Sequence, residues 1–324
     1  MDTLNLQKQK SPQGDLLAPF SWSERLPQFK KELEEIGMQT DSTPLVTAIL
    51  SNNVEWVKEI LQSDCRDINT LDRLGVSPLG YAVRMIDGDN IVRTLVMHES
   101  CDLNIKDPVI GKTALMVAAE ENKSEIAKIL LLSKKIDPNL KSDVGNYTAL
   151  MMAVMYKSLD VIKILLDDPR VDVNITEVTD FPPLMSAVQD NELEIVKIFL
   201  ENKRVDINAV DKEGVTALMS ATIFQHKEII KKLIEAGADV NLVSNHGVYV
   251  GFTALMIAVY DGDIEVVKSL LTAKDINLNI CNEFGKTALM IAVANNCPLI
   301  IKELLANSTI NPNIMGGLPS EPRS

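Results

Sequence analysis

A short motif recurs along this chain at nearly constant spacing, and this regularity limits what the chain can fold into. The eight copies run from "STPLVTAI" at Ser42 to "KTALMIAV" at Lys286. Their central leucines follow one another at intervals of 34 to 37 residues: Leu45, Leu79, Leu115, Leu150, Leu184, Leu218, Leu255 and Leu289. Self-similarity at this period is typical of proteins in which each unit packs only on its neighbours.

Each copy predicts a pair of helices. An alanine follows every central leucine by three positions, so both side chains lie on one face of a helix, where a small residue lets neighbouring helices approach closely. A second amphipathic segment comes next, such as "DVIKILL" from Asp160, and its lysine is expected to point to water. A turn signal such as "DVN" from Asp172 ends the unit, because Asp and Asn side chains bond nearby backbone.

This organisation resembles the ankyrin-repeat family. The resemblance covers about Asp41 to Ile314 and implies an all-α solenoid, with eight ankyrin repeats in residues 41–314 and projecting hairpins between them. The family usually has histidine in its "TPLH" motif, whereas this chain has methionine there. We expect these methionines to pack in the core. They are Met116, Met151, Met185, Met219, Met256 and Met290.

The two ends of the chain differ from the repeats. Residues 1–20 are polar and predict a disordered tail. Residues 21–40 predict one helix that caps the first repeat; the alternative is a docking helix that recruits an enzyme. Residues 315–324 also predict a disordered tail, although the outer helix before them, "CPLIIKELLANS", is as apolar as the internal ones. The last repeat is therefore exposed, covered by the folded-back tail, or covered by another surface.

Composition narrows the choice of partners and location. The formal net charge of −13 disfavours nucleic acid and anionic membranes as partners. No apolar run is long enough for a membrane helix, and the N-terminus lacks the apolar core of a secretory signal. The four cysteines have neither disulfide-framework nor zinc spacing. We expect a cytoplasmic protein, and a nuclear location or delivery into a host cell stays open.

No catalytic, metal-binding or cofactor-binding motif emerges from the sequence, so we expect no enzyme, no metal and no cofactor. The family resemblance implies one modification, because some ankyrin repeats are substrates of an asparaginyl hydroxylase. The matching leucine-to-asparagine spacing occurs at Asn174, Asn208 and Asn241. The alternative is that each asparagine only shapes its turn.

The resemblance also indicates where a partner would bind. In ankyrin repeats the partner-facing positions are the hairpin residues just before the motif and the end of the first helix. Eight of the eleven aromatic residues within the repeats fall at these positions, all in repeats four to eight. The predicted binding residues are Tyr147, Met155, Tyr156, Phe181, Asp190, Ile223, Phe224, Tyr249, Phe252, Tyr260, Asp261 and Phe284. A face this apolar suggests an interaction site.

We therefore expect a non-catalytic protein-interaction module or scaffold whose partner segment carries apolar side chains and some Lys or Arg. Intramolecular packing could instead explain the aromatics that precede the motif, Tyr147, Phe181 and Phe252, better than those that end the first helix. Two alternative functions stay open, each compatible with a host-directed effector. One is assembly through the C-terminal repeat; the other is targeting, with an enzyme recruited by the N-terminal segment. The oligomeric state is undecided.

Overall fold

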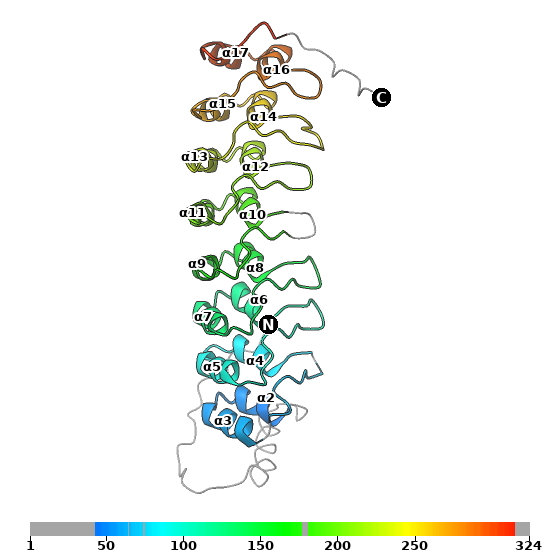
Figure 1. The fold of residues 1–324 in the computed structure, drawn as a ribbon, viewed down its shortest axis with the longest axis vertical. Helices are drawn as coiled ribbons and strands as arrows, with labels where there is room; N and C mark the ends of the chain where they lie inside the picture. Colours follow the sequence, from blue (N-terminus) through cyan, green and yellow to red (C-terminus); the bar gives the residue numbers. More distant parts are fainter. Residues whose placement is uncertain (1–42, 64, 74, 177–180, 315–324) are drawn as a thin grey trace, which may run out of the picture.

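The computed structural model describes residues 43–63, 65–73, 75–176 and 181–314. Within these ranges sixteen α-helices stack in pairs into one elongated solenoid, and β-structure is limited to an isolated bridge between Val210 and Thr216 (Figure 1). The predicted all-α solenoid of eight repeats is confirmed. The expected capping helix and both expected tails lie outside the described residues.

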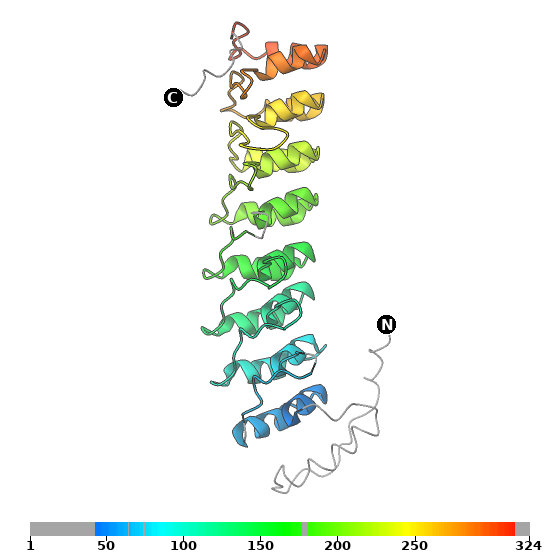
Figure 2. The same cartoon turned by 90° about the vertical axis from the view of Figure 1, so that its right-hand side faces the viewer.

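Each repeat contributes an inner and an outer helix, and hairpin loops project beside the inner helices (Figure 1). The inner helices are α2 (Pro44–Leu50), α4 (Pro78–Arg84), α6 (Ala114–Glu120), α8 (Ala149–Met155), α10 (Pro183–Gln189), α12 (Ala217–Ile223), α14 (Ala254–Tyr260) and α16 (Ala288–Ala294). The outer helices are α3 (Val54–Ser63), α5 (Asp89–Met97), α7 (Ser124–Leu132), α9 (Leu159–Asp167), α11 (Leu193–Glu201), α13 (Lys227–Glu235), α15 (Ile264–Leu270) and α17 (Pro298–Leu305). The helix pairs stack one above another along the long axis of the solenoid (Figure 2).

The threonine of the repeated motif starts the inner helix. The side chain of Thr148 accepts a hydrogen bond from the backbone N of Met151 at 3.3 Å, which satisfies one of the donors that a helix start leaves free. Thr216 and Thr253 do the same in later repeats. Pro182 holds this position in the fifth repeat and offers no side-chain cap.

The alanines and most of the methionines of the motif lie in the core, together with many leucines, isoleucines and valines. All eight alanines that follow the central leucines are at most 1% exposed. Five of the six motif methionines are buried, which confirms the packing role expected for them, and Met290 in the last repeat is half-buried. Inner helices therefore approach one another through small side chains, with methionine filling the space between repeats.

A ladder of asparagines joins each repeat to the next. The amide of Asn139 donates to the carbonyl of Arg170 at 2.7 Å and accepts from the backbone N of Asp172 at 2.8 Å. The same two bonds recur at other repeats, and Asn208 makes the accepting bond alone. The asparagines that make both are Asn69, Asn104, Asn139, Asn174, Asn241 and Asn279.

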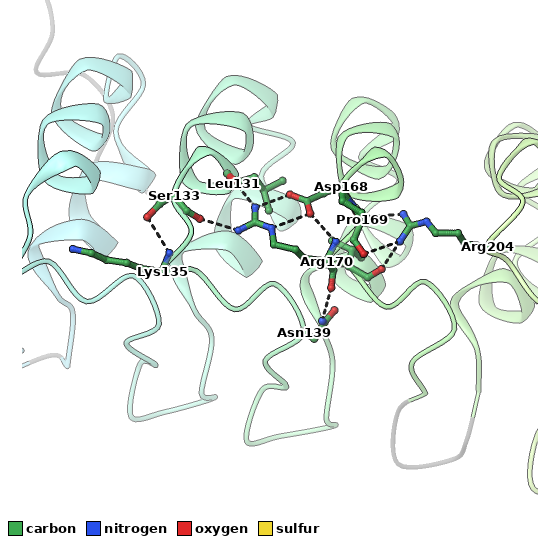
Figure 3. A network of polar contacts seen from close by, with 9 residues as sticks. Leu131, Ser133, Lys135, Asn139, Asp168, Pro169, Arg170 and Arg204 are labelled. Atoms are coloured by element: carbon green, nitrogen blue, oxygen red, sulfur yellow. Dashed lines mark hydrogen bonds and ion pairs between the residues drawn. The ribbon is translucent and has the colours of Figure 1, made fainter.

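Cationic side chains reach back to the outer helix of the preceding repeat (Figure 3). The guanidinium of Arg170 donates to the carbonyls of Leu131 and Ser133 at the end of α7, and it pairs with Asp168 at 2.7 Å. Arg204 makes equivalent bonds to carbonyls at the end of α9. Positive charge is favourable at a helix C-terminus, where backbone carbonyls lack helical partners.

In seven of the eight repeats, the turn between the two helices has one residue in the left-handed region. Asparagine, which tolerates this region, holds the position in four repeats, and Gly262 holds it in the seventh. Lys157 and Gln225 adopt it with φ of 57° and 59°. These two repeats therefore carry a small backbone strain that the others avoid.

Candidate protein-binding face

The hairpin residue before the helix cap faces the last residue of the inner helix. In the third repeat these positions hold Lys112 and Glu120, whose side chains form an ion pair at 2.7 Å. Uncharged side chains replace this pair in four later repeats: Tyr147 and Met155, Phe181 and Gln189, Val215 and Ile223, and Phe252 and Tyr260. We call the twelve binding residues predicted above the candidate face.

A groove of about 510 Å³ crosses the candidate face at repeats four to six. It brings together four of the predicted residues: Tyr147, Met155, Phe181 and Asp190. It is also lined by three hairpin residues that were not among the candidates, namely Asp211, Lys212 and Glu213. The groove thus has an apolar part and a charged part in which carboxylates outnumber the single lysine.

A cluster of three aromatic rings lies in the seventh repeat. Its hairpin is longer than the others and is closed by a bond from the N of Ser244 to the carbonyl of Phe252 at 3.0 Å. Tyr249 lies inside this loop, where its carbonyl accepts from the N of Phe252 at 2.8 Å. The rings of Tyr249, Phe252 and Tyr260 have centroids 5.9 to 6.3 Å apart. The inserted hairpin residues therefore position Tyr249 against the other two rings.

Exposure divides the predicted aromatics by position. Those that end the inner helices are open to solvent: Tyr156 is 49% exposed, Phe224 45% and Tyr260 53%. Those that precede the cap are more covered, because Phe252 is buried and Tyr147 and Phe181 are half-buried. Tyr249 and Ile223 are half-buried, while Met155, Asp190, Asp261 and Phe284 are exposed. The helix-end aromatics are thus the part of the face that a partner could reach most directly.

Two of the face residues have shifted protonation equilibria. Hydrogen bonding to Glu120, together with the negative charge of that residue, raises the pKa of the Tyr156 hydroxyl. Partial burial and the neighbouring charge of Asp263 raise the pKa of the Asp261 carboxyl. Phe224 stacks on His226 with ring centroids 5.8 Å apart. Repeats three and four are therefore linked through Glu120, whereas no cation among the described residues forms an ion pair with Asp261.

The asparagines that match the hydroxylase spacing already have structural roles. The side chains of Asn174, Asn208 and Asn241 all accept hydrogen bonds from the next repeat. Their position in the ladder supports the turn-shaping alternative, and their modification stays a prediction.

Within the ranges that the structure describes, no three His, Cys, Asp or Glu side chains gather to hold a metal ion, and all four cysteines are free. No helix among the described residues has the length and apolarity needed to cross a membrane.

The stacked helix–turn–helix units, their projecting hairpins and a face built from hairpins and inner-helix ends define an α-solenoid of the repeat class. A family model described as ankyrin repeats (3 copies) matches residues 24–107, 88–177, 169–244 and 241–315. The chain belongs to the ankyrin-repeat family, and the resemblance inferred from its motifs is confirmed.

Two solved structures illustrate the likeness. The ankyrin repeat domain of Bcl-3, described as a unique member of the IkappaB protein family, is 26% identical with a TM-score of 0.63; the match covers 71% of this chain and 98% of that one. An ankyrin repeat domain from Acinetobacter baumannii AYE is 29% identical with a TM-score of 0.52, covering 59% and 96% respectively. No curated protein matches the chain.

Proposed function

We propose that this protein is a non-catalytic interaction module that holds a segment of another protein against the candidate face of repeats four to eight. Ankyrin repeats are generally protein–protein interaction modules. The observation that carries the proposal is the exposure of Tyr156, Phe224 and Tyr260 at the ends of three inner helices, in a chain with only 4% aromatic residues. Exposed aromatics of this kind are the usual anchors of an interface.

The groove supports a partner of mixed chemistry. The side chains of Tyr147, Met155 and Phe181 offer apolar surface, and Asp190 and Glu213 add exposed carboxylates at its edge. The chain as a whole is strongly acidic, with a formal net charge of −13, so a basic segment is attracted to it. The partner segment therefore carries apolar side chains together with Lys or Arg, in an extended or helical form.

A pull-down from a cell extract tests the proposal with a combined Tyr156→Ala, Phe224→Ala and Tyr260→Ala variant. We expect the bound proteins to disappear while circular dichroism and the melting temperature stay close to wild type. A matched control removes two exposed apolar side chains from the outer helices, Met97→Ala and Leu132→Ala, and it should retain the bound proteins. An unchanged set of bound proteins on the folded triple variant would show that the candidate face is not the binding site.

A second candidate function is assembly through the eighth repeat. Val293 is 59% exposed, whereas Val259, its counterpart one repeat earlier, is fully buried. Leu299 and Leu305 on α17 are 68% and 50% exposed, and exposed apolar side chains gathered in one repeat favour coverage by another surface. Light scattering over a range of concentrations tests this candidate. Association that Leu299→Lys abolishes supports it, and a monomer at every concentration rules out self-assembly.

A further inference from the structure

The aromatic cluster of the seventh repeat has the arrangement of a cation subsite. We propose that Tyr249, Phe252 and Tyr260, together with Asp261, receive the charged end of a lysine or arginine side chain from the partner segment. This inference rests on the proposed function, because the cluster is part of the candidate face. It goes further by assigning one chemistry to one place on that face.

The first support is the orientation of the rings. The planes of Phe252 and Tyr260 meet at 82°, those of Tyr249 and Tyr260 at 85°, and those of Tyr249 and Phe252 at 59°. The two nearly perpendicular pairs pack edge to face, and the three centroids form a nearly equilateral triangle. A cation is attracted to the face of an aromatic ring within about 6 Å of its centroid, so a cation over an exposed ring face of this cluster has the other two rings close by.

The second support is the graded burial of the cluster. Phe252 is 9% exposed and forms the base, Tyr249 is half-buried, and Tyr260 is 53% exposed at the rim. A side chain that approaches from solvent therefore meets Tyr260 first and Phe252 last. Partial removal of water at such a place strengthens the attraction between a cation and the rings.

The third support is the carboxylate beside the rings. Asp261 directly follows Tyr260 at the end of α14, and partial burial and then the charge of Asp261 raise the pKa of the Tyr249 hydroxyl. Within the described part of the chain, Asp261 has no ion-pair partner. Its neighbour Asp263 lies 3.8 Å from Lys227 and caps the start of α15. The cluster thus combines aromatic faces with a negative charge that the chain leaves uncompensated.

The seventh repeat lacks the cation that the third repeat has at the corresponding position. The positions of Phe252 and Tyr260 correspond to those of Lys112 and Glu120, where the chain supplies its own cation to its own carboxylate. The seventh repeat has rings at both positions and a carboxylate one residue later, at Asp261. A cation from outside would complete the charge balance that the third repeat achieves internally.

Nuclear magnetic resonance on the full chain tests the subsite with three small probes: N-acetyl-lysine amide, N-acetyl-arginine amide and N-acetyl-norleucine amide. Norleucine has the alkyl chain of lysine without its charge. We expect the two cationic probes to shift the ring signals of Tyr249 and Tyr260, and norleucine amide to bind at least about threefold more weakly. The Tyr260→Ala and Asp261→Asn variants should each weaken cation binding, roughly threefold to thirtyfold for the ring and less for the charge.

Leu132→Ala, which alters an exposed side chain on α7, is the matched control and should leave cation binding unchanged. Equal binding of norleucine amide, or cation binding that neither Tyr260→Ala nor Asp261→Asn weakens, would overturn the subsite. The pull-down separates the two proposals. If the triple alanine variant loses the partner but Asp261→Asn keeps full affinity, the binding face stands and the cation subsite is wrong. If the triple variant keeps every bound protein while the cationic probes still bind the rings of the wild-type chain, the proposed function fails and the cation-binding chemistry stands.

Discussion

Lys112 donates a hydrogen bond to Glu120 at 2.7 Å, and these two residues hold the same positions in their repeat as Phe252 and Tyr260 hold in theirs. The fold therefore brings the same two backbone positions together in the third and seventh repeats, although their side chains differ. In the third repeat these positions form an ion pair, and in the seventh they form an aromatic pair that gives the face an apolar surface. The identity of this pair sets the chemistry of the face repeat by repeat.

The charge of Glu120 should control the ionisation of Tyr156. Hydrogen bonding and charge from Glu120 raise the pKa of the tyrosine hydroxyl, because they favour its neutral form. Replacing Glu120 with Gln removes the negative charge, so we expect the pKa of Tyr156 to fall toward the ordinary tyrosine value. Titration of the labelled tyrosine ring by nuclear magnetic resonance measures this shift. Glu125→Gln on the exposed side of α7 is the control, and an equal fall there would contradict the assignment.

The asparagine ladder should contribute to stability at each internal step. Asn139→Ala removes two hydrogen bonds to the next repeat and should lower the free energy of unfolding by about 1–2 kcal/mol. Asn313 occupies the same position in the eighth repeat, and its side-chain amide has no partner among the described residues. Asn313→Ala should therefore cost little. Urea unfolding measures both variants, and equal losses would mean that the ladder bonds contribute nothing.

The contribution of Arg170, which caps the preceding outer helix, to the free energy of unfolding should also be measurable. Arg170→Met keeps much of the apolar stem but removes the bonds to Leu131 and Ser133, so we expect a loss of about 1–2 kcal/mol. Lys203→Met, at an exposed lysine of the neighbouring turn, is the matched control and should be nearly neutral. Thermal and urea unfolding compare the two. A neutral Arg170→Met would show that water replaces the guanidinium at these carbonyls.

The left-handed turn residue offers a way to increase stability. Gln225 adopts φ of 59°, and asparagine tolerates this region better, so Gln225→Asn should raise the free energy of unfolding by about 0.5–1 kcal/mol. The reciprocal change at the same position of the fifth repeat, Asn191→Gln, should lower it by a similar amount. Opposite signs in urea unfolding support this account, and a loss at both sites contradicts it.

The third hairpin should make stability depend on pH through Asp107. Burial would raise the pKa of this carboxyl, but backbone hydrogen bonds from Ile110, Lys112 and Val109 outweigh it and lower the pKa. A carboxyl whose folded pKa is lowered stabilises the fold above its unfolded pKa of about 4, and this contribution is lost as pH falls through the folded value.

The stability advantage of wild type over Asp107→Asn should therefore be present at neutral pH and shrink below about pH 4. Urea unfolding over a series of pH values measures this advantage. Asp160→Asn, at an exposed position in the first turn of α9, is the matched control and should show a smaller dependence. An advantage for wild type that does not change with pH would contradict the role of the carboxylate.

The repeated unit explains how much of the fold could be predicted from sequence. Leucine and alanine recur at one spacing in every copy, and methionine follows the leucine in six of the eight, so the pattern of one unit predicts the whole stack. The bonds between repeats were not predicted, because they join residues more than 30 positions apart. Asn139 indicates a local turn in sequence, and only the folded stack shows that its amide reaches the next repeat.

The exposure of a candidate residue could be predicted where its position in the repeat determines its surroundings. Tyr260 is the last residue of its inner helix and Tyr156 directly follows the end of its own, and the exposure of both positions followed from the repeat. The charged part of the groove was missed, because Asp211 lies in an ordinary hairpin signal and its carboxylate accepts bonds from the N atoms of Glu213 and Val215. The contact of Tyr249 with the other two rings depends on a hairpin longer than the usual one, and repeat spacing alone does not give its shape.

The asparagine ladder has a mechanical consequence. Each amide connects a repeat only to its immediate successor, so a pulling force along the chain meets a series of similar links between repeats. When a link yields, the repeat behind it unravels while its neighbours hold. A repeat of about 34 residues releases roughly 110 to 120 Å of extended chain. Under force the solenoid should therefore lengthen in steps, about one repeat at a time.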